Sequence, residues 1–168
     1  MTYIEKLFNR PDVIAAIEDE NLDYVYKLDS TEEITEFLLA KGVNPLEYVT
    51  EVWAYMFFGQ DISSITIPGQ IKTIHNRAFE SCIDLETVTI EEGVKRIKTH
   101  AFAACNHIEV VNLPSTIEGI GEWAFLSKGM RVNYNGTVDD FDKIVMGSEA
   151  FAPGTKIYCL KDNFLYLW

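Results

Sequence analysis

The sequence predicts an α+β solenoid in which about three full coils stack between degenerate end coils, behind an N-terminal helical cap. Three observations carry this prediction. From residue 64 onward the chain repeats itself every 23 residues, and the matching positions are almost all apolar. The first 59 residues lack the repeat and carry helical patterns instead. A single short coil cannot bury its own apolar side, so neighbouring coils must stack and share one core.

The clearest mark of the repeat is an Ala-Phe pair, which occurs as Ala78-Phe79, Ala101-Phe102 and Ala124-Phe125. The other matching apolar columns are Ile65, Val88 and Val111; Ile67, Ile90 and Leu113; Ile71, Val94 and Ile117; and Ile74, Ile97 and Ile120. Each column is expected to form a ladder of side chains, with coils separated by about one strand spacing, roughly 4.8 Å.

Within one coil the residue types predict a short strand, a turn, a second strand and a compact segment. The β-branched run from Thr87 to Ile90 favours the first strand. Glu92-Gly93 then turns the chain, and Val94 to Ile97 predicts the second strand. The segment from Thr99 to Cys105 carries the Ala-Phe pair, and we expect a short helical or 3₁₀ turn there.

These motifs resemble a known family. The pattern apolar-x-x-Ile-x-Ile-Pro, followed by Ile-Gly-x-x-Ala-Phe-x-x-Cys, is similar to the BspA-like leucine-rich repeats of bacteria, their phages and some protists. Residues 121–125 fit the motif closely, and residues 134–159 resemble the degenerate last coil of such arrays. One departure is Lys128, which stands where the earlier copies have Cys82 and Cys105. The resemblance covers about residues 60–160 and implies an interaction or adhesion role.

The N-terminal third reads as short helices. Residues 2–8 and the segment after Pro11 have apolar residues at helical spacing. Ser30 and Glu33 form a capping-box pattern for a helix that ends near Lys41-Gly42. Asn44-Pro45 is expected to start a further helix that turns the side chains of Leu46, Val49, Val52 and Trp53 inward.

The chain therefore divides into an acidic helical segment, residues 1–59, and a solenoid, residues 60–168. A shift of 23 residues back from Phe79 lands on Met56, so Met56 to Ile62 reads as half of an earlier coil. The end of a solenoid exposes strand edges and apolar surface. We therefore interpret residues 1–59 as a cap; the alternative is a separate recognition module.

The net charge is −12, and residues 1–60 hold 12 acidic and 4 basic side chains of the total. Such a charge argues against direct binding to DNA or to anionic lipid. It suits a basic protein partner, a mimic of nucleic acid, or an ordinary solvated surface. No signal peptide and no long apolar run are visible, which favours a cytoplasmic location, although members of the family are often secreted or surface-exposed.

The sequence predicts no enzyme. It lacks the serine-hydrolase, zinc-protease and phosphate-loop motifs, and we expect no catalytic residue, cofactor or metal. His75 and His100 are near-equivalent in the repeat but shifted by two places, so they form no ladder. Cys82 and Cys105 share a column and are expected to be small buried residues rather than a disulfide or a zinc site.

Candidate binding residues lie on the strand face opposite the core, because side chains alternate along a strand. They are mostly small and polar: Ser64, Thr66, Thr87, Thr89, Val110, Asn112 and Asn133. This strip is either a docking surface for a protein or glycan, or an ordinary exposed strand face. The chain ends in an apolar run whose two alternatives are a plug over the last coil and a contact for self-association: Phe164, Leu165, Tyr166, Leu167 and Trp168.

We therefore expect a non-enzymatic protein–protein interaction module, such as an intracellular bacterial or phage binder that inhibits a host factor. Two alternatives remain open at this point. One is an acidic nucleic-acid mimic that acts through the N-terminal helices. The other is a fragment of an adhesion-type surface protein.

Overall fold

The computed structural model describes residues 31–168, and its contacts divide into two units, residues 1–49 and residues 50–168. The predicted helices at residues 2–8 and after Pro11, and the Ser30 cap, lie outside the described residues. The second unit begins ten residues before the boundary expected at residues 59 and 60. The reason is that Glu51–Val52 already pairs with the solenoid as strand β1.

Helix α4 spans Thr31–Ala40 in the first unit. It ends as the sequence predicts, since Gly42 follows with a φ of 73° and the Gly42 N–H donates to the Leu39 carbonyl at 2.9 Å. Ile34 and Leu38 are buried. The role of residues 1–59 as a cap stays a prediction.

The helix expected after Asn44 is shorter than predicted. It is a single 3₁₀ turn, η1, at Pro45–Tyr48, and the Asn44 side chain caps it by accepting from Leu46 N–H at 3.1 Å. The prediction of a helix through Trp53 was therefore wrong. Pairing of the next residues with a strand of the following coil replaces helical hydrogen bonds there.

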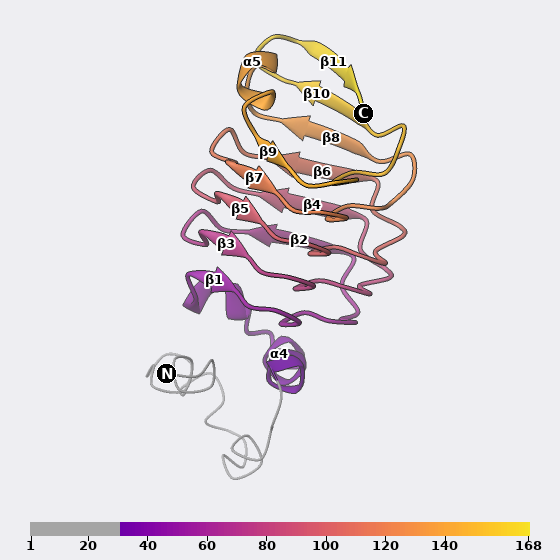
Figure 1. Cartoon of the computed structure of the whole chain (residues 1–168). Coiled ribbons are helices and arrows are strands. Elements are labelled where there is room, and N and C mark those ends of the chain that lie inside the picture. The colour runs from indigo at the N-terminus through magenta and orange to yellow at the C-terminus, as the bar shows by residue number, and fades with distance from the viewer. Residues whose placement is uncertain (1–30) are drawn as a thin grey trace. The chain divides into compact units, whose positions relative to one another are not determined.

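The second unit is a β-solenoid whose successive coils run through two facing sheets (Figure 1). The six-stranded sheet has the order β11-β10-β8-β6-β4-β2, and the five-stranded sheet has the order β1-β3-β5-β7-β9. The first sheet contains β2 at Ser64–Ile67, β4 at Thr87–Ile90, β6 at Val110–Leu113, β8 at Arg131–Tyr134, β10 at Lys156–Cys159 and β11 at Phe164–Leu167. The second contains β1 at Glu51–Val52, β3 at Thr73–Ile74, β5 at Arg96–Ile97, β7 at Gly119–Ile120 and β9 at Val145–Met146.

The predicted solenoid is thus confirmed, and its apolar columns form the core. Strands β2, β4, β6, β8 and β10 pair in parallel and in register, so Val88, Val111 and Val132 follow one another in the buried row. β11 alone in that sheet runs antiparallel, against β10. It carries the chain back across the last coil.

A stack of phenylalanine rings runs along the core. The centroids of Phe57, Phe79, Phe102 and Phe125 lie 4.7, 4.8 and 4.7 Å apart, and Phe151 follows at 5.6 Å. These distances match the strand spacing, because each ring belongs to one coil. Phe57, not Met56, is the partner of Phe79. The prediction of Met56 was one residue early, since the first coil pairs with an offset of 22 residues at Val52 and Ile74.

The segment from Thr99 to Cys105 forms consecutive turns and no helix. His100 and Ala104 have φ values of 59° and 58°, a left-handed conformation that ends any right-handed helix. The His100 N–H donates across coils to the Glu122 carbonyl at 2.9 Å. The expected helical turn does not become a helix, because single-turn bonds, such as that from the Ala103 N–H to the His100 carbonyl at 3.0 Å, alternate with bonds to the next coil.

The C-terminal end of the stack is covered by its own chain. Helix α5, Val138–Phe141, begins with a capping box between Thr137 and Asp140. The Phe141 ring lies 5.3 Å from that of Tyr134 and 5.8 Å from that of Tyr166. The Trp168 ring lies 5.5 Å from the Phe151 ring, edge to face. Tyr166 and Trp168 thus plug the last coil.

Candidate functional site

The outward side of the six-stranded sheet, here called the outer face, contains all seven residues predicted for binding. Two rows of side chains cross it at right angles to the strands. The first row is Ser64, Thr87, Val110, Arg131, Lys156 and Leu167, and the second is Thr66, Thr89, Asn112, Asn133, Tyr158 and Leu165. The residues between these positions on each strand are mostly buried, so the alternation predicted from the sequence places the candidates correctly.

A chain of hydrogen bonds links Thr89, Asn112 and Asn133 of the second row and continues to Arg131 of the first row. The Asn112 amide donates to Thr89 Oγ1 at 3.1 Å, and the Asn133 amide donates to Asn112 Oδ1 at 2.8 Å. Arg131 Nε then donates to Asn133 Oδ1 at 2.7 Å. The parallel register brings identical positions of successive coils together, which makes such a chain possible. It fixes the amide orientations on a flat, polar surface.

The C-terminal end of the outer face has a different character. Arg131, Lys156, Tyr158, Leu165 and Leu167 lie together there on β8, β10 and β11, and we call them the C-terminal anchor. The Arg131 guanidinium carbon lies 4.3 Å from the centroid of the Tyr158 ring. This is a cation–π contact between the guanidinium and the face of the ring.

None of the anchor residues was among the predicted strand-face candidates. Lys156 follows Arg131 by 25 residues rather than 23, because the intervening coil contains α5. Leu165 and Leu167 belong to an antiparallel strand that has no place in the repeat. The alternation in residues 156–159 was the one signal that could have identified Tyr158, whose neighbours Ile157 and Cys159 are buried.

At the ends of these strands one carboxylate bridges three coils. Glu92 accepts from the Ser115 N–H at 2.9 Å, the Ser115 hydroxyl at 3.1 Å and the Asn135 amide at 2.8 Å. Desolvation is the largest single influence on the Glu92 pKa and raises it, but the hydrogen bonds together outweigh it and lower the pKa. Next to it lies a hollow of about 240 Å³, lined among others by Pro114, Asn133 and Leu160.

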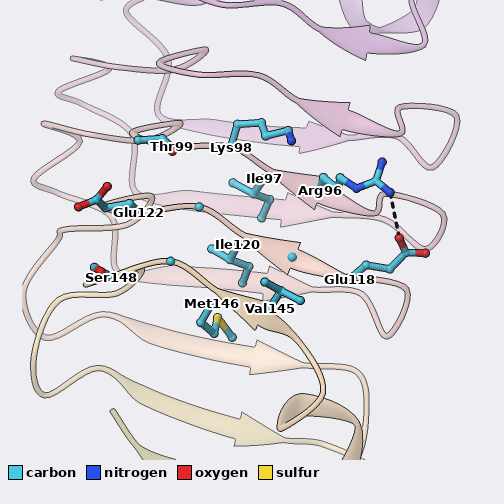
Figure 2. A pocket seen from close by; sticks show the side chains of 13 residues that line it. Arg96, Ile97, Lys98, Thr99, Glu118, Ile120, Glu122, Val145, Met146 and Ser148 are labelled. Atoms are coloured by element: carbon cyan, nitrogen blue, oxygen red, sulfur yellow. Dashed lines mark hydrogen bonds and ion pairs between the residues drawn. The ribbon is translucent and has the colours of Figure 1, made fainter.

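A larger groove of about 610 Å³ crosses the outward side of the five-stranded sheet over β5, β7 and β9 (Figure 2). Gly119 opens it, because this glycine lies between Arg96 and Val145 in the row of outward positions. Glu118 in the lining of the groove pairs with Lys95 at 2.6 Å and with Arg96 at 3.4 Å, and Lys98 and Glu122 also line it. The groove offers no convergent set of polar groups for chemistry.

The three cysteines are buried thiols, as the sequence predicts for Cys82 and Cys105. The sulfurs of Cys82 and Cys105 donate to the carbonyls of Phe57 and Phe79 of the preceding coils, both at 2.9 Å. A hydrogen bond with the Cys82 sulfur and burial both raise the pKa of the Cys105 thiol. The Cys105 thiol is therefore held in its protonated form, and both sulfurs link adjacent coils through a hydrogen bond.

Within residues 31–168 no cluster of three or more His, Cys, Asp or Glu side chains has the arrangement of a metal site. None of the helices in this same range has the length and apolarity that crossing a bilayer requires. The surface features of the solenoid are thus the outer face, its C-terminal anchor and the shallow groove on the opposite sheet.

The sequence from residue 25 to residue 153 matches the family model described as BspA type leucine rich repeat region (6 copies). The chain belongs to this family. The match confirms the resemblance found in the repeat motifs and extends it into the helical segment, before the predicted start at residue 60. No curated protein matches the sequence significantly. A BspA-type repeat region supports a protein-interaction or adhesion-type module.

Three solved structures are similar to the BspA-type chain. A leucine-rich repeat protein from Bacteroides ovatus ATCC 8483 is 24% identical, with a TM-score of 0.47, over 68% of this chain and 30% of that protein. The pneumococcal vaccine antigen PcpA is 21% identical, with a TM-score of 0.46, over 71% of this chain and 40% of that protein. A leucine rich cell surface protein from Faecalibacterium prausnitzii A2-165 is 17% identical, with a TM-score of 0.26, over 51% and 35%. The chain thus spans well under half of the length of these proteins.

Proposed function

We propose that this BspA-type chain is a non-enzymatic protein-binding module that docks its partner on the outer face of the six-stranded sheet. The observation that carries the proposal is the chain of hydrogen bonds from Thr89 through Asn112 and Asn133 to Arg131. These cross-strand hydrogen bonds hold the exposed side chains in one arrangement. A pre-ordered surface loses less side-chain entropy when it binds.

The anchor supplies the residue types that dominate protein interfaces. Tyrosine and arginine are enriched among the few interface residues that carry most of the binding energy. Here Arg131 and Tyr158 contact each other, with exposed Leu165 and Leu167 beside them. The polar row then acts as the surrounding surface that makes the contact specific.

The proposal is tested by comparing two variants that add the same side chain to opposite sheets. Thr87→Arg places a bulky charge on the outer face, at a residue with no side-chain hydrogen bond to lose among residues 31–168. Ser148→Arg places it beside the groove on the five-stranded sheet. We expect a protein captured from a lysate of the source organism to be lost with Thr87→Arg and retained with Ser148→Arg. The opposite pattern would assign binding to the other sheet.

Two hypotheses predict different dependences of affinity on salt. One is an intracellular binder that inhibits a host factor, and the other is an acidic nucleic-acid mimic. A mimic contacts a basic groove through many charge pairs, so its affinity falls by orders of magnitude between about 0.05 and 0.2 M salt. Docking through the polar outer face changes far less over the same range. Affinity of the captured partner measured at both salt concentrations distinguishes the two.

A further inference from the structure

We propose that the C-terminal anchor is a carboxylate-binding site that receives an acidic side chain, flanked by apolar residues, from a segment of the protein partner. This inference rests on the proposed function, because it names the chemistry that the outer face recognises. The anchor is a part of the outer face that the repeat itself does not generate.

Two contacts hold the Arg131 side chain in place. Its Nε donates to Asn133 Oδ1 at 2.7 Å, and its guanidinium carbon lies 4.3 Å from the Tyr158 ring centroid. Of the three guanidinium nitrogens, Nε is the one engaged in a hydrogen bond. The two terminal nitrogens form no hydrogen bond with any residue from 31 to 168. A planar fork with both ends free and its stem held is the geometry that binds a carboxylate through two parallel hydrogen bonds.

The anchor contains two adjacent positive charges, on Arg131 and Lys156. Lys156 is the in-register neighbour of Arg131 on β10, and both side chains are exposed. Neither pairs with a carboxylate of the described residues. In a chain of net charge −12, two adjacent cations without internal partners form a local patch complementary to an anion.

Two exposed leucines on β11 lie beside these cations. Leu165 and Leu167 are 43% and 69% exposed, and they lie in register with Tyr158 and Lys156. A partner that covers these leucines also excludes water from the cations, which strengthens a charge-assisted hydrogen bond. An acidic residue between apolar neighbours on an extended segment would fill both parts of the anchor.

The same observations favour a protein over a nucleic acid. A polyphosphate needs a run of cations along its backbone, and bases need a series of stacking rings. The anchor offers two cations and Tyr158, and the chain as a whole repels polyanions. A single carboxylate with apolar neighbours is complementary to the two cations and the exposed leucines of the anchor.

The experiment is a titration of the isotopically labelled full chain, followed by NMR, with a short synthetic peptide in which aspartate alternates with leucine. The matched control peptide has asparagine in place of aspartate. We expect the aspartate peptide to perturb the Arg131 Nε–H and the Asn133 side-chain amide, and to bind at least about tenfold more tightly than the asparagine peptide. Equal binding by the two peptides, or perturbations confined to other surfaces, would overturn the proposal.

Three variants sharpen the result. Arg131→Gln should weaken the aspartate peptide about tenfold, and Arg131→Lys should give an intermediate loss because it keeps the charge but not the fork. Arg96→Gln makes the same change on the opposite sheet and should have no effect. Unchanged affinity in Arg131→Gln, with the fold intact by NMR, would reject the site.

Two further occupants are outcomes of the same study. A single-stranded oligodeoxythymidylate that binds the anchor more tightly than the aspartate peptide would replace the protein partner by a nucleic acid. A concentration-dependent dimer in sedimentation that Arg131→Gln leaves unchanged, and that blocks peptide binding, would assign β11 to self-association. Either result overturns the inference. The proposed function fails separately, when Thr87→Arg leaves capture of the partner unchanged.

Discussion

The rings of Phe79 and Phe102 stack in adjacent coils, with centroids 4.8 Å apart and planes inclined by 2°. Both side chains are fully buried. The stack exists because the two residues hold the same position in consecutive coils that pair in register. Each ring therefore supports both neighbours, and the loss of one weakens two contacts.

Phe102→Ala is expected to lower the free energy of unfolding by about 3–5 kcal/mol, since it removes a buried ring and leaves a cavity in the stack. The melting temperature should fall by roughly 6–20 °C for a chain of this size. Thermal unfolding followed by circular dichroism measures this change. Trp123→Ala, at a partly exposed ring, is the control and should cost far less. A melting temperature close to that of the parent would contradict the stack.

Ala104→Gly is expected to stabilise the protein. Ala104 is exposed and has a φ of 58°, a conformation that costs an alanine about 1–2 kcal/mol and a glycine almost nothing. After the larger backbone entropy of glycine in the unfolded chain is subtracted, a net gain of about 0.5–1 kcal/mol remains. Denaturant unfolding measures it. Ala54→Gly, at an exposed alanine without positive φ, should destabilise instead.

Two glycines of the groove should respond oppositely to alanine. A Cβ at Gly121 would lie 2.4 Å from the Thr99 nitrogen, so Gly121→Ala forces the backbones of adjacent coils apart. We expect a loss of at least about 2 kcal/mol, as for other severe overpacking. A Cβ at Gly119 would lie 3.5 Å from the Val145 carbonyl, an ordinary contact, and Gly119→Ala should be tolerated. Similar melting temperatures for the two variants would rule out the close coil spacing at Gly121.

The Glu92 bridge predicts a pH-dependent contribution to stability. Its folded-state pKa is lowered, so the stabilisation is complete above the unfolded pKa of about 4.3 and is lost as pH falls through the folded value. Glu92→Gln should therefore lower the melting temperature near pH 7, by about 1–3 °C. The gap between parent and variant should narrow as pH drops below 4 to 5. A gap that is constant from pH 7 to pH 3 would show that the charge contributes nothing.

Deletion of residues 1–49 tests the predicted cap. The end of a solenoid that loses its cover exposes strand edges and apolar surface, so aggregation or unfolding of residues 50–168 is expected. Light scattering and circular dichroism of the truncated chain measure both. A soluble, monomeric and cooperatively folded product would instead favour a separate recognition module.

The candidate site shows where sequence patterns suffice and where they do not. Side-chain alternation places Thr87, Thr89 and Asn112 on the outer face correctly, because each strand has one buried row and one exposed row. It misses the partnership of Arg131 with Tyr158, since those residues meet only after a coil of irregular length has closed. The 23-residue period also misplaced the first ring of the stack. The first two coils are offset by 22 residues, so Phe57 and not Met56 stacks on Phe79.

The sequence by itself determined the solenoid, its apolar ladders and the buried cysteines. Those features follow from a repeated pattern of residue types, and a stack of like coils has one way to bury them. Only the tertiary structure decided which side chains of different coils touch: the hydrogen bonds from Thr89 to Arg131, the bridge at Glu92 and the plug formed by Tyr166 and Trp168. The first two join neighbouring coils through side-chain rotamers that a repeat of residue types does not specify, and the plug depends on β11, which reverses direction outside the repeat.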